Sequence, residues 1–185
     1  MVIKMMEMIR EIVYRLRGEY TTKWLVKNGM TVGRNFKRLN GVILDPSHCW
    51  LIEIGDNVTM APRVHILCHD ASTKQFLGYT KIGRVSIGDN VFIGAETVVL
   101  PGVHIGNNVV IGANSTVTHD IPDNSVAFGS PARVYSSLDQ YVAKEKKHMD
   151  ESPQYDRRFT LGGNITVKLK MKQKEDLKNG IGYIV

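Results

Sequence analysis

A run of six-residue repeats is the feature that most restricts how this chain can fold. From Ile87 to Pro122 the sequence divides into six consecutive blocks, IGDNVF, IGAETV, VLPGVH, IGNNVV, IGANST and VTHDIP. The first position of every block is Ile or Val, and the fifth is mostly β-branched. A period of six matches neither the turn of a helix nor the alternation of an amphipathic strand. The chain must therefore turn once per block.

Each block indicates a short strand followed by a corner, with successive coils paired through backbone hydrogen bonds. The first and fifth positions are expected to point inward and to form an aliphatic prism. Glycine at the second position of four blocks suits a corner that needs close backbone approach or a positive φ. The Asp and Asn residues that follow tolerate left-handed conformations. Ile and Val together number 36, against 12 Leu, which also favours a mainly β protein.

The same pattern occurs earlier, from Ile54 and more weakly from Val32, so the coil is predicted over residues 31–134. Ile54 and Ile87 are 33 residues apart, which is five blocks and three residues. The frame therefore slips, and the segment from about Cys68 to Lys81 must leave the coil as a loop. A loop of this length on a rigid scaffold is more often functional than idle.

The segments that flank the coil lack the repeat, so we predict three parts: a cap over 1–30, the coil over 31–134 and an extension over 135–185. The cap contains an amphipathic pattern that predicts a helix docked on the open end of the coil. Its apolar face comprises Met5, Met8, Ile9, Ile12, Val13 and Leu16. The extension is predicted to contain a helix from Leu138 to about Met149 and a solvated strand in NITVKLKMK.

Charge and composition argue against several classes of function. The net charge of +6 comes from the two flanks, while residues 31–134 carry 8 basic and 8 acidic side chains. Because the excess of basic side chains is spread over both flanks, no nucleic-acid partner is predicted. Two cysteines and the lack of a signal-like apolar segment predict a reducing, cytoplasmic location. Weak attachment of the N-terminal helix to an anionic membrane surface is the alternative to its capping role.

The sequence resembles the hexapeptide-repeat acyltransferases, whose fold is a left-handed parallel β-helix of the all-β class. The similar strings are IGDNVTMAPRVHIL followed by His69, and IGANSTVTHDIPDNSVAFGSPARV at the end of the coil. Within the family the chain looks most like the galactoside and maltose O-acetyltransferases and related polysaccharide O-acetyltransferases. The resemblance implies acetyl-CoA as co-substrate, no metal, and a homotrimer with active sites between neighbouring subunits.

His69 is the general base that the resemblance implies. A histidine just after the AP-x-V-x-I segment has this role in the family, and here it opens the loop where the repeat breaks. Imidazole is well suited to take a proton from a hydroxyl near neutral pH as the oxygen attacks a thioester carbonyl. The implied reaction is direct acetyl transfer to a sugar or polysaccharide hydroxyl.

The resemblance also implies residues that bind the two substrates. Asp45, in the sequence DPS, is predicted to orient His69 or to bind the acceptor; the alternative is an ordinary Asp-Pro turn. Asn40 is predicted to bind the acceptor, and Phe92 matches an aromatic residue that lines the cleft or packs between subunits. The residues predicted to contact coenzyme A are Ala95, Ala113, Thr118 and Arg133.

Three alternatives stay open at the level of sequence. An N-acetyltransferase would act on an amino sugar or an antibiotic. A zinc enzyme of the γ-carbonic anhydrase type would draw its ligands from His48, His65, Cys68 and His69. A non-catalytic scaffold would use the coil alone, and turnover of acetyl-CoA would exclude it.

Overall fold

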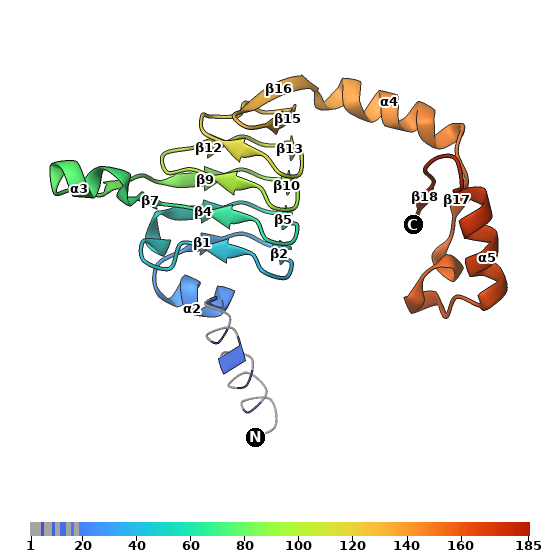
Figure 1. Cartoon of the computed structure of the whole chain (residues 1–185), viewed down its shortest axis with the longest axis horizontal. Coiled ribbons are helices and arrows are strands. Elements are labelled where there is room, and N and C mark those ends of the chain that lie inside the picture. The colour runs from blue at the N-terminus through green and yellow to red at the C-terminus, as the bar shows by residue number, and fades with distance from the viewer. Residues whose placement is uncertain (1–4, 6–8, 10–11, 14–15, 17–18) are drawn as a thin grey trace. The chain divides into compact units, whose positions relative to one another are not determined.

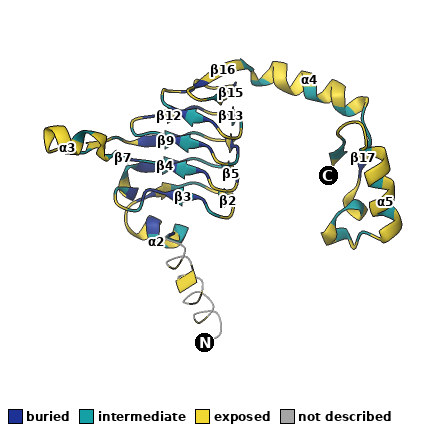
Figure 2. Ribbon diagram, in the orientation of Figure 1, coloured by how far each residue is buried: buried dark blue, intermediate teal, exposed yellow. Residues whose placement is uncertain are grey.

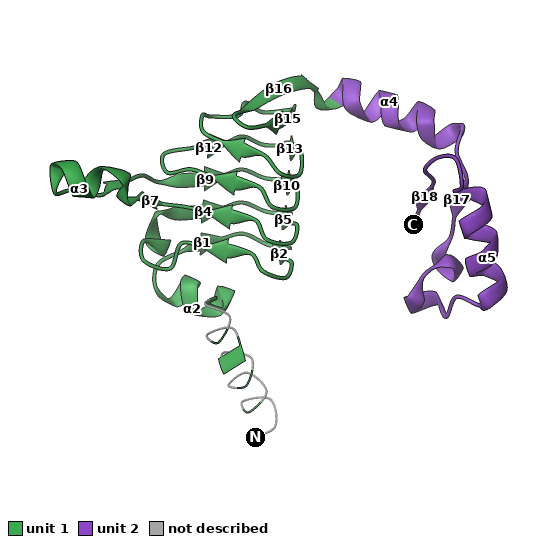
Figure 3. Ribbon diagram, in the orientation of Figure 1, with its two compact units in different colours: residues 1–138 green, residues 139–185 purple. Residues whose placement is uncertain are grey.

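The computed structural model describes residues 5, 9, 12–13, 16 and 19–185. The chain divides into two compact units, Met1–Leu138 and Asp139–Val185 (Figure 3). The first unit contains a parallel β-helix in which one short strand from each of three sheets makes one turn (Figure 1).

The three sheets are named here A, B and C. Sheet A contains β1 (Thr31–Val32), β4 (Ile52–Ile54), β9 (Val85–Ile87) and β12 (His104–Ile105). Sheet B contains β2 (Lys37–Arg38), β5 (Thr59–Met60), β10 (Phe92–Ile93), β13 (Val110–Ile111), β15 (Ser125–Gly129) and β16 (Ala132–Ser137). Sheet C contains β3 (Ile43–Leu44), β6 (His65–Ile66), β11 (Val98–Val99) and β14 (Thr116–Val117). Neighbouring strands are parallel except β15 and β16, which form an antiparallel hairpin at one end of sheet B.

The inward positions predicted from the repeat are confirmed. Every first-position and fifth-position side chain from Ile87 to Ile121 is at most 3% exposed. Figure 2 shows the buried residues on the strands of the coil. Burial of one Ile or Val side chain contributes about 1.5–3 kcal/mol. The stacked aliphatic residues are therefore the main source of the coil's stability.

Asparagine forms a ladder along the corner between sheets A and B. Its members are Asn35, Asn57, Asn90, Asn108 and Asn124, and all have φ between 55° and 57°. Each amide nitrogen donates to the amide oxygen of the next asparagine at 2.9–3.0 Å. Asparagine tolerates this left-handed backbone better than most residues do. The left-handed residue is thus the fourth of each of these blocks rather than the second-position glycine.

The second-position glycines are needed for close approach of neighbouring coils. A Cβ on Gly94 would lie 2.4 Å from the backbone nitrogen of Ala113 and 2.7 Å from its Cα. We expect Gly94→Ala to lower the free energy of unfolding by about 1–3 kcal/mol, as overpacking usually does. Urea unfolding measures this, with Gly180→Ala as control because nothing lies within 4 Å of its added Cβ. Equal stability of the two variants would contradict the prediction.

The predicted loop leaves the coil as an arm made of an antiparallel hairpin (Figure 1). β7 (His69–Asp70) pairs with β8 (Lys81–Ile82), and η2 (Ala71–Thr73) and α3 (Lys74–Leu77) lie between them. The N–H of Gly83 donates to the carbonyl of Cys68 at 2.9 Å and closes the base of the arm. Three large side chains near the tip, Phe76, Leu77 and Tyr79, are 67–81% exposed.

α2 (Thr22–Lys27) covers the first coil. Its N-cap is Thr21, whose hydroxyl accepts from the N–H of Trp24 at 3.2 Å, and Leu25 is fully buried in the core. The amphipathic helix predicted from Met5 to Leu16 lies largely outside the described residues. In the part of the chain that is described, capping is performed by α2.

The second unit corrects one prediction about the extension. α4 (Leu138–Asp150) is the predicted helix, and β17 (Gln154–Tyr155) pairs in parallel with β18 (Tyr183–Ile184). η3 (Arg157–Phe159) and η4 (Leu161–Gly163) precede α5 (Val167–Asp176), which occupies most of the predicted solvated strand. That strand prediction was wrong because Lys, Leu, Met and Gln are strong helix formers and Thr166 caps the helix. Every helix in the described residues is too short or too polar to cross a bilayer.

Candidate active site

Asp45 and His69 meet at the corner between sheets C and A. Asp45 follows β3, and His69 begins β7 shortly after β6, the next strand of sheet C. Because the two coils stack, Oδ2 of Asp45 lies 2.5 Å from Nδ1 of His69. The structure therefore brings the predicted base and the predicted carboxylate into direct contact.

Backbone groups hold the Asp45 carboxylate in place. Oδ2 also accepts from the N–H of Cys68 at 2.9 Å, and Oδ1 accepts from the N–H of Ser47 at 3.0 Å. Burial alone would raise the pKa of Asp45, but the hydrogen bonds from His69 and Cys68 outweigh burial and hold this pKa below its usual value. An ionised carboxylate only accepts, so Nδ1 of His69 carries the ring proton. Nε2 then has a lone pair with which to accept a proton.

The lowered pKa of Asp45 has a consequence for stability. Its ionised form stabilises the fold fully above the unfolded value of about 3.9, and this stabilisation is lost as pH falls through the lower pKa of the folded state. We expect Asp45→Asn to be less stable than wild type at pH 7, and the difference to shrink below about pH 4. Thermal unfolding from pH 3 to pH 7 measures this difference, with Asp139→Asn at an exposed position as control. A difference that does not depend on pH would contradict the prediction.

Two residues next to His69, Cys68 and Asp70, stabilise the fold and do not take part in the candidate chemistry. The Asp70 carboxylate lies 2.5 Å from Nζ of Lys81 at the base of the arm, and this contact lowers the pKa of Asp70 to about 2. The thiol of Cys68 is fully buried, and burial raises its pKa to about 12. Asp70 is thus paired within the hairpin, and Cys68 is a poor nucleophile and a poor metal ligand.

Three other predicted residues lie at a different corner, between sheets B and C. The carbonyl of Ala95 accepts from the N–H of Asn114, which follows Ala113, at 2.8 Å. Ala113 is exposed, and so is Asn40, whose carbonyl accepts from the N–H of Arg63 at 3.0 Å. The strands of sheet C separate this corner from the corner that carries His69.

The remaining predicted residues are spread over the coil. Thr118 follows β14, and its hydroxyl lies 2.7 Å from Nδ1 of His119. Arg133 is exposed in β16 and donates to the carbonyl of Ala132 at 2.9 Å. Phe92 is 45% exposed on sheet B, in register with Thr59 and Val110. One chain by itself does not gather these residues around His69.

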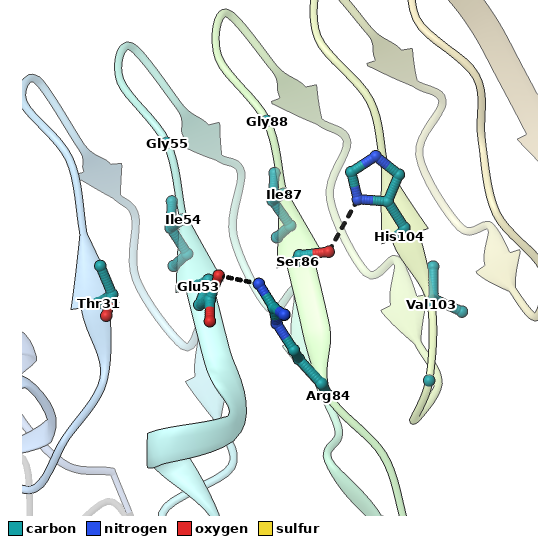
Figure 4. Close-up of a pocket in the computed structure, with 11 residues that line it drawn as sticks. Thr31, Glu53, Ile54, Gly55, Arg84, Ser86, Ile87, Gly88, Val103 and His104 are labelled. Carbon is teal, nitrogen blue, oxygen red and sulfur yellow. Dashed lines mark hydrogen bonds and ion pairs between the residues drawn. The ribbon is translucent and has the colours of Figure 1, made fainter.

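A groove of about 660 Å³ crosses the outer face of sheet A, where polar and apolar residues both line it (Figure 4). Glu53 forms an ion pair with Arg84 there, and the hydroxyl of Ser86 lies 2.8 Å from Nδ1 of His104. Asp120 accepts from the backbone N–H of His104 and not from its ring, so the pair lacks the carboxylate of a catalytic triad. Sequence reasoning missed this groove because its lining comes from separate coils.

His48 is a neighbour of His69 that the sequence indicates only as a zinc ligand. The two ring centroids lie 5.4 Å apart. Within the described residues, the side chains placed to hold a metal are Asp45, His48 and His69, with one ligand atom of each within 4.8 Å of the others. His65 and Cys68 are outside this group, so the four residues of the zinc alternative are not brought together as one set.

Comparisons with known proteins agree with the repeat. Residues 84–119 match the family model described as bacterial transferase hexapeptide (six repeats). A Saccharomyces cerevisiae protein named as an acetyltransferase is 36% identical over 140 residues, which cover 69% of this chain and 70% of that protein.

Two solved structures are similar to the coil. A maltose O-acetyltransferase from Clostridium difficile 630 has a TM-score of 0.52 and 43% identity, covering 59% of each chain. A hexapeptide-repeat acetyltransferase from Vibrio cholerae, complexed with acetyl-CoA, has a TM-score of 0.52 and 28% identity, covering 60% of this chain and 61% of that one.

The chain spans between 45% and 63% of the length of the first curated relatives it matches. The hexapeptide-repeat relatives imply the left-handed winding of the coil. With the repeat, the buried prism and these matches together, the chain belongs to the hexapeptide-repeat acyltransferase family.

Proposed function

We propose that this protein is an acetyl-CoA-dependent O-acetyltransferase that acts on a hydroxyl of a sugar or polysaccharide, with His69 as general base. The observation that carries the proposal is the pair of Asp45 and His69, in which a buried carboxylate orients a part-exposed imidazole. The maltose O-acetyltransferase and the acetyl-CoA complex among its relatives support the choice of substrates.

In the proposed reaction, Nε2 of His69 takes the proton of the acceptor hydroxyl as its oxygen attacks the thioester carbonyl. The carbon–sulfur bond then breaks, and the leaving thiolate takes the proton from the imidazolium. Asp45 stabilises the imidazolium in between, because its carboxylate already bonds to Nδ1. No covalent intermediate with the protein is needed.

A second copy of the chain completes the proposed site. His69 lies at the corner where the strands of sheet C end, which is called here the His69 edge. Ala95 and Ala113 lie at the corner where these strands begin, which is called here the alanine edge. In a cyclic trimer packed through sheet C, the His69 edge of one subunit faces the alanine edge of the next. The exposed apolar side chains at the tip of the arm support such an assembly, because a neighbouring subunit would cover them.

The alanine edge is suited to the pantetheine arm of the co-substrate. Ala95 is part-exposed and Ala113 is exposed, and their small side chains allow an extended ligand to approach the two stacked corners closely. Thr118, which follows β14 at the corner between sheets C and A, supplies a hydroxyl, and the guanidinium of Arg133 suits a phosphate group.

The test is release of thiol from acetyl-CoA with a panel of sugars, oligosaccharides, nucleotide sugars and amines. We expect sugar hydroxyl acceptors to stimulate release and the product to be an ester that mild alkali cleaves. An alkali-stable product formed only from amines would favour the N-acetyltransferase alternative. Release that no acceptor stimulates would contradict the proposal.

A further inference from the structure

The connection between β3 and β4 is longer than its counterpart in a later coil. Seven residues, 45–51, lie between these strands, whereas four residues, 100–103, lie between β11 and β12 at the same corner. The additional length forms η1 (Cys49–Leu51), with His48 immediately before it. The coil therefore carries an additional turn directly beside Asp45.

α2 holds this turn in place. The thiol of Cys49 is fully buried and donates to the carbonyls of Leu25 at 3.7 Å and Asn28 at 3.4 Å. A Cβ on Gly29 would lie 2.8 Å from Cβ of Trp50, so the absence of a side chain there lets the two segments touch. Packing of the turn against α2 and the residues at its end therefore helps to set the positions of His48 and Trp50.

The ring of His48 neighbours the rings of both His69 and Trp50. The ring of His48 lies 5.4 Å from that of His69 and 5.3 Å from that of Trp50, measured between centroids. Trp50 is 54% exposed. A half-exposed indole beside His48, which itself neighbours the base, offers an apolar surface to a bound molecule.

His48 has a ring nitrogen that the described part of the chain does not satisfy. Nδ1 of His48 is buried and has no hydrogen-bond partner among the described residues. A lone pair is cheaper to bury than an unpaired N–H, so the ring proton belongs on Nε2. His48 is then a hydrogen-bond donor, whereas His69 accepts at its own Nε2.

The spacing of the two rings suits one oxygen atom between them. One ring nitrogen of His48, one ring nitrogen of His69 and a carboxylate oxygen of Asp45 all lie within 4.8 Å of one another. Two nitrogens that each bond at about 2.8 Å to one oxygen, at a tetrahedral angle, are about 4.6 Å apart. A single hydroxyl oxygen can therefore bridge the pair.

We propose that His48 and Trp50 form the acceptor subsite and that His48 selects hydroxyl over amine acceptors. This inference rests on the proposed function. The acceptor oxygen accepts from His48 through one lone pair, attacks with the other, and gives its hydrogen to His69. His48 neither gains nor loses a proton. The exposed face of Trp50 packs against the apolar face of a pyranose ring.

The selection follows from the number of lone pairs. A hydroxyl oxygen has two, so it can accept from His48 and still attack the thioester. An amine nitrogen has one lone pair, and attack needs it. An amine acceptor therefore cannot accept from His48, which leaves the donor of His48 unpaired in the complex, and binding sites discriminate strongly on that ground.

The experiment compares a pyranose hydroxyl acceptor with its amino-deoxy analogue in wild type, His48→Phe, His48→Gln and Trp50→Ala. We expect His48→Phe to lower kcat/KM for the hydroxyl acceptor by about 10- to 100-fold and to raise the amine value, because the donor that an amine leaves unpaired is removed. His48→Gln, which restores an N–H, should recover part of the loss. Trp50→Ala should raise KM for the pyranose more than it raises KM for a small acyclic alcohol.

Each result bears on the inference. An equal fall with both acceptors, or no recovery in His48→Gln, would overturn it and assign His48 a structural role. A metal ion retained by Asp45, His48 and His69 in purified protein, removed by a chelator with a gain of activity, would also overturn it. If His48→Phe transfers acetyl groups with the same ratio of kcat/KM for hydroxyl and amine acceptors as wild type, only this inference is contradicted. If wild type transfers none to any acceptor, the proposed function is contradicted as well.

Discussion

Replacing His69 with alanine is expected to lower kcat/KM for acetyl transfer by about 10²- to 10⁴-fold, the usual contribution of a general base. The loss should fall on kcat, because the hydroxyl proton is removed during attack on the thioester and the base makes little contact with the coenzyme. Thiol release at saturating acetyl-CoA measures it. Part-exposed His69 lies outside the core, so the variant should keep the fold, with some loss of stability because the buried Asp45 loses its ring donor.

The matched control is His148→Ala, which removes an exposed histidine from the second unit. This control should retain full activity. Circular dichroism of both variants shows whether the coil is intact. A loss smaller than about 10-fold in His69→Ala, with the coil intact, would remove His69 from the role of base.

The coil could be predicted from the sequence because one physical rule decides every block. The side chains at the first and fifth positions must face the prism, and that rule correctly identifies Thr97 and Ser115 as buried although they are polar. Both hydroxyls find a partner in the carbonyl of Gly112, at 3.0 and 2.7 Å. Burial of a polar group with a hydrogen-bond partner costs little.

The partners of His69 could be predicted only in part. Asp45 and Asp70 are both near the base in principle, and the choice between them depends on how coils stack. The N–H of Asp45 donates to the carbonyl of Ile66 at 3.0 Å, which sets the register that brings its carboxylate under His69. Adjacent Asp70 instead pairs with Lys81 across the hairpin. This contact could not be predicted because the two residues are far apart in the sequence.

His48 and α5 show two further limits of sequence reasoning. The additional turn that carries His48 is visible as a longer spacing between strands, but its direction depends on packing against α2. In α5, alternation of Lys with Leu and Met fits a strand, while the same residues have high helix propensity. No signal within so short a segment decides between the two.

The separation of the base from the alanine edge leads to the second large effect. If the two halves of the site come from neighbouring subunits, a trimer that mixes His69→Ala with Ala113→Trp subunits regains what each variant alone lacks. The first variant retains the alanine edge, and the second retains the base. In a cyclic trimer with both kinds of subunit, one of the three interfaces is complete, so about a third of wild-type activity is expected.

The most direct test of the account is therefore activity of co-expressed, doubly tagged hybrids purified through both tags. His69→Ala with Ala113→Trp should give about a third of wild-type activity, while each variant alone should give almost none. The matched control combines His69→Ala with Asp45→Ala; these two changes damage the same half of the site, so no recovery is expected. Failure of the first pair to recover activity above its parents, in hybrids that remain trimeric, would contradict a site shared between subunits.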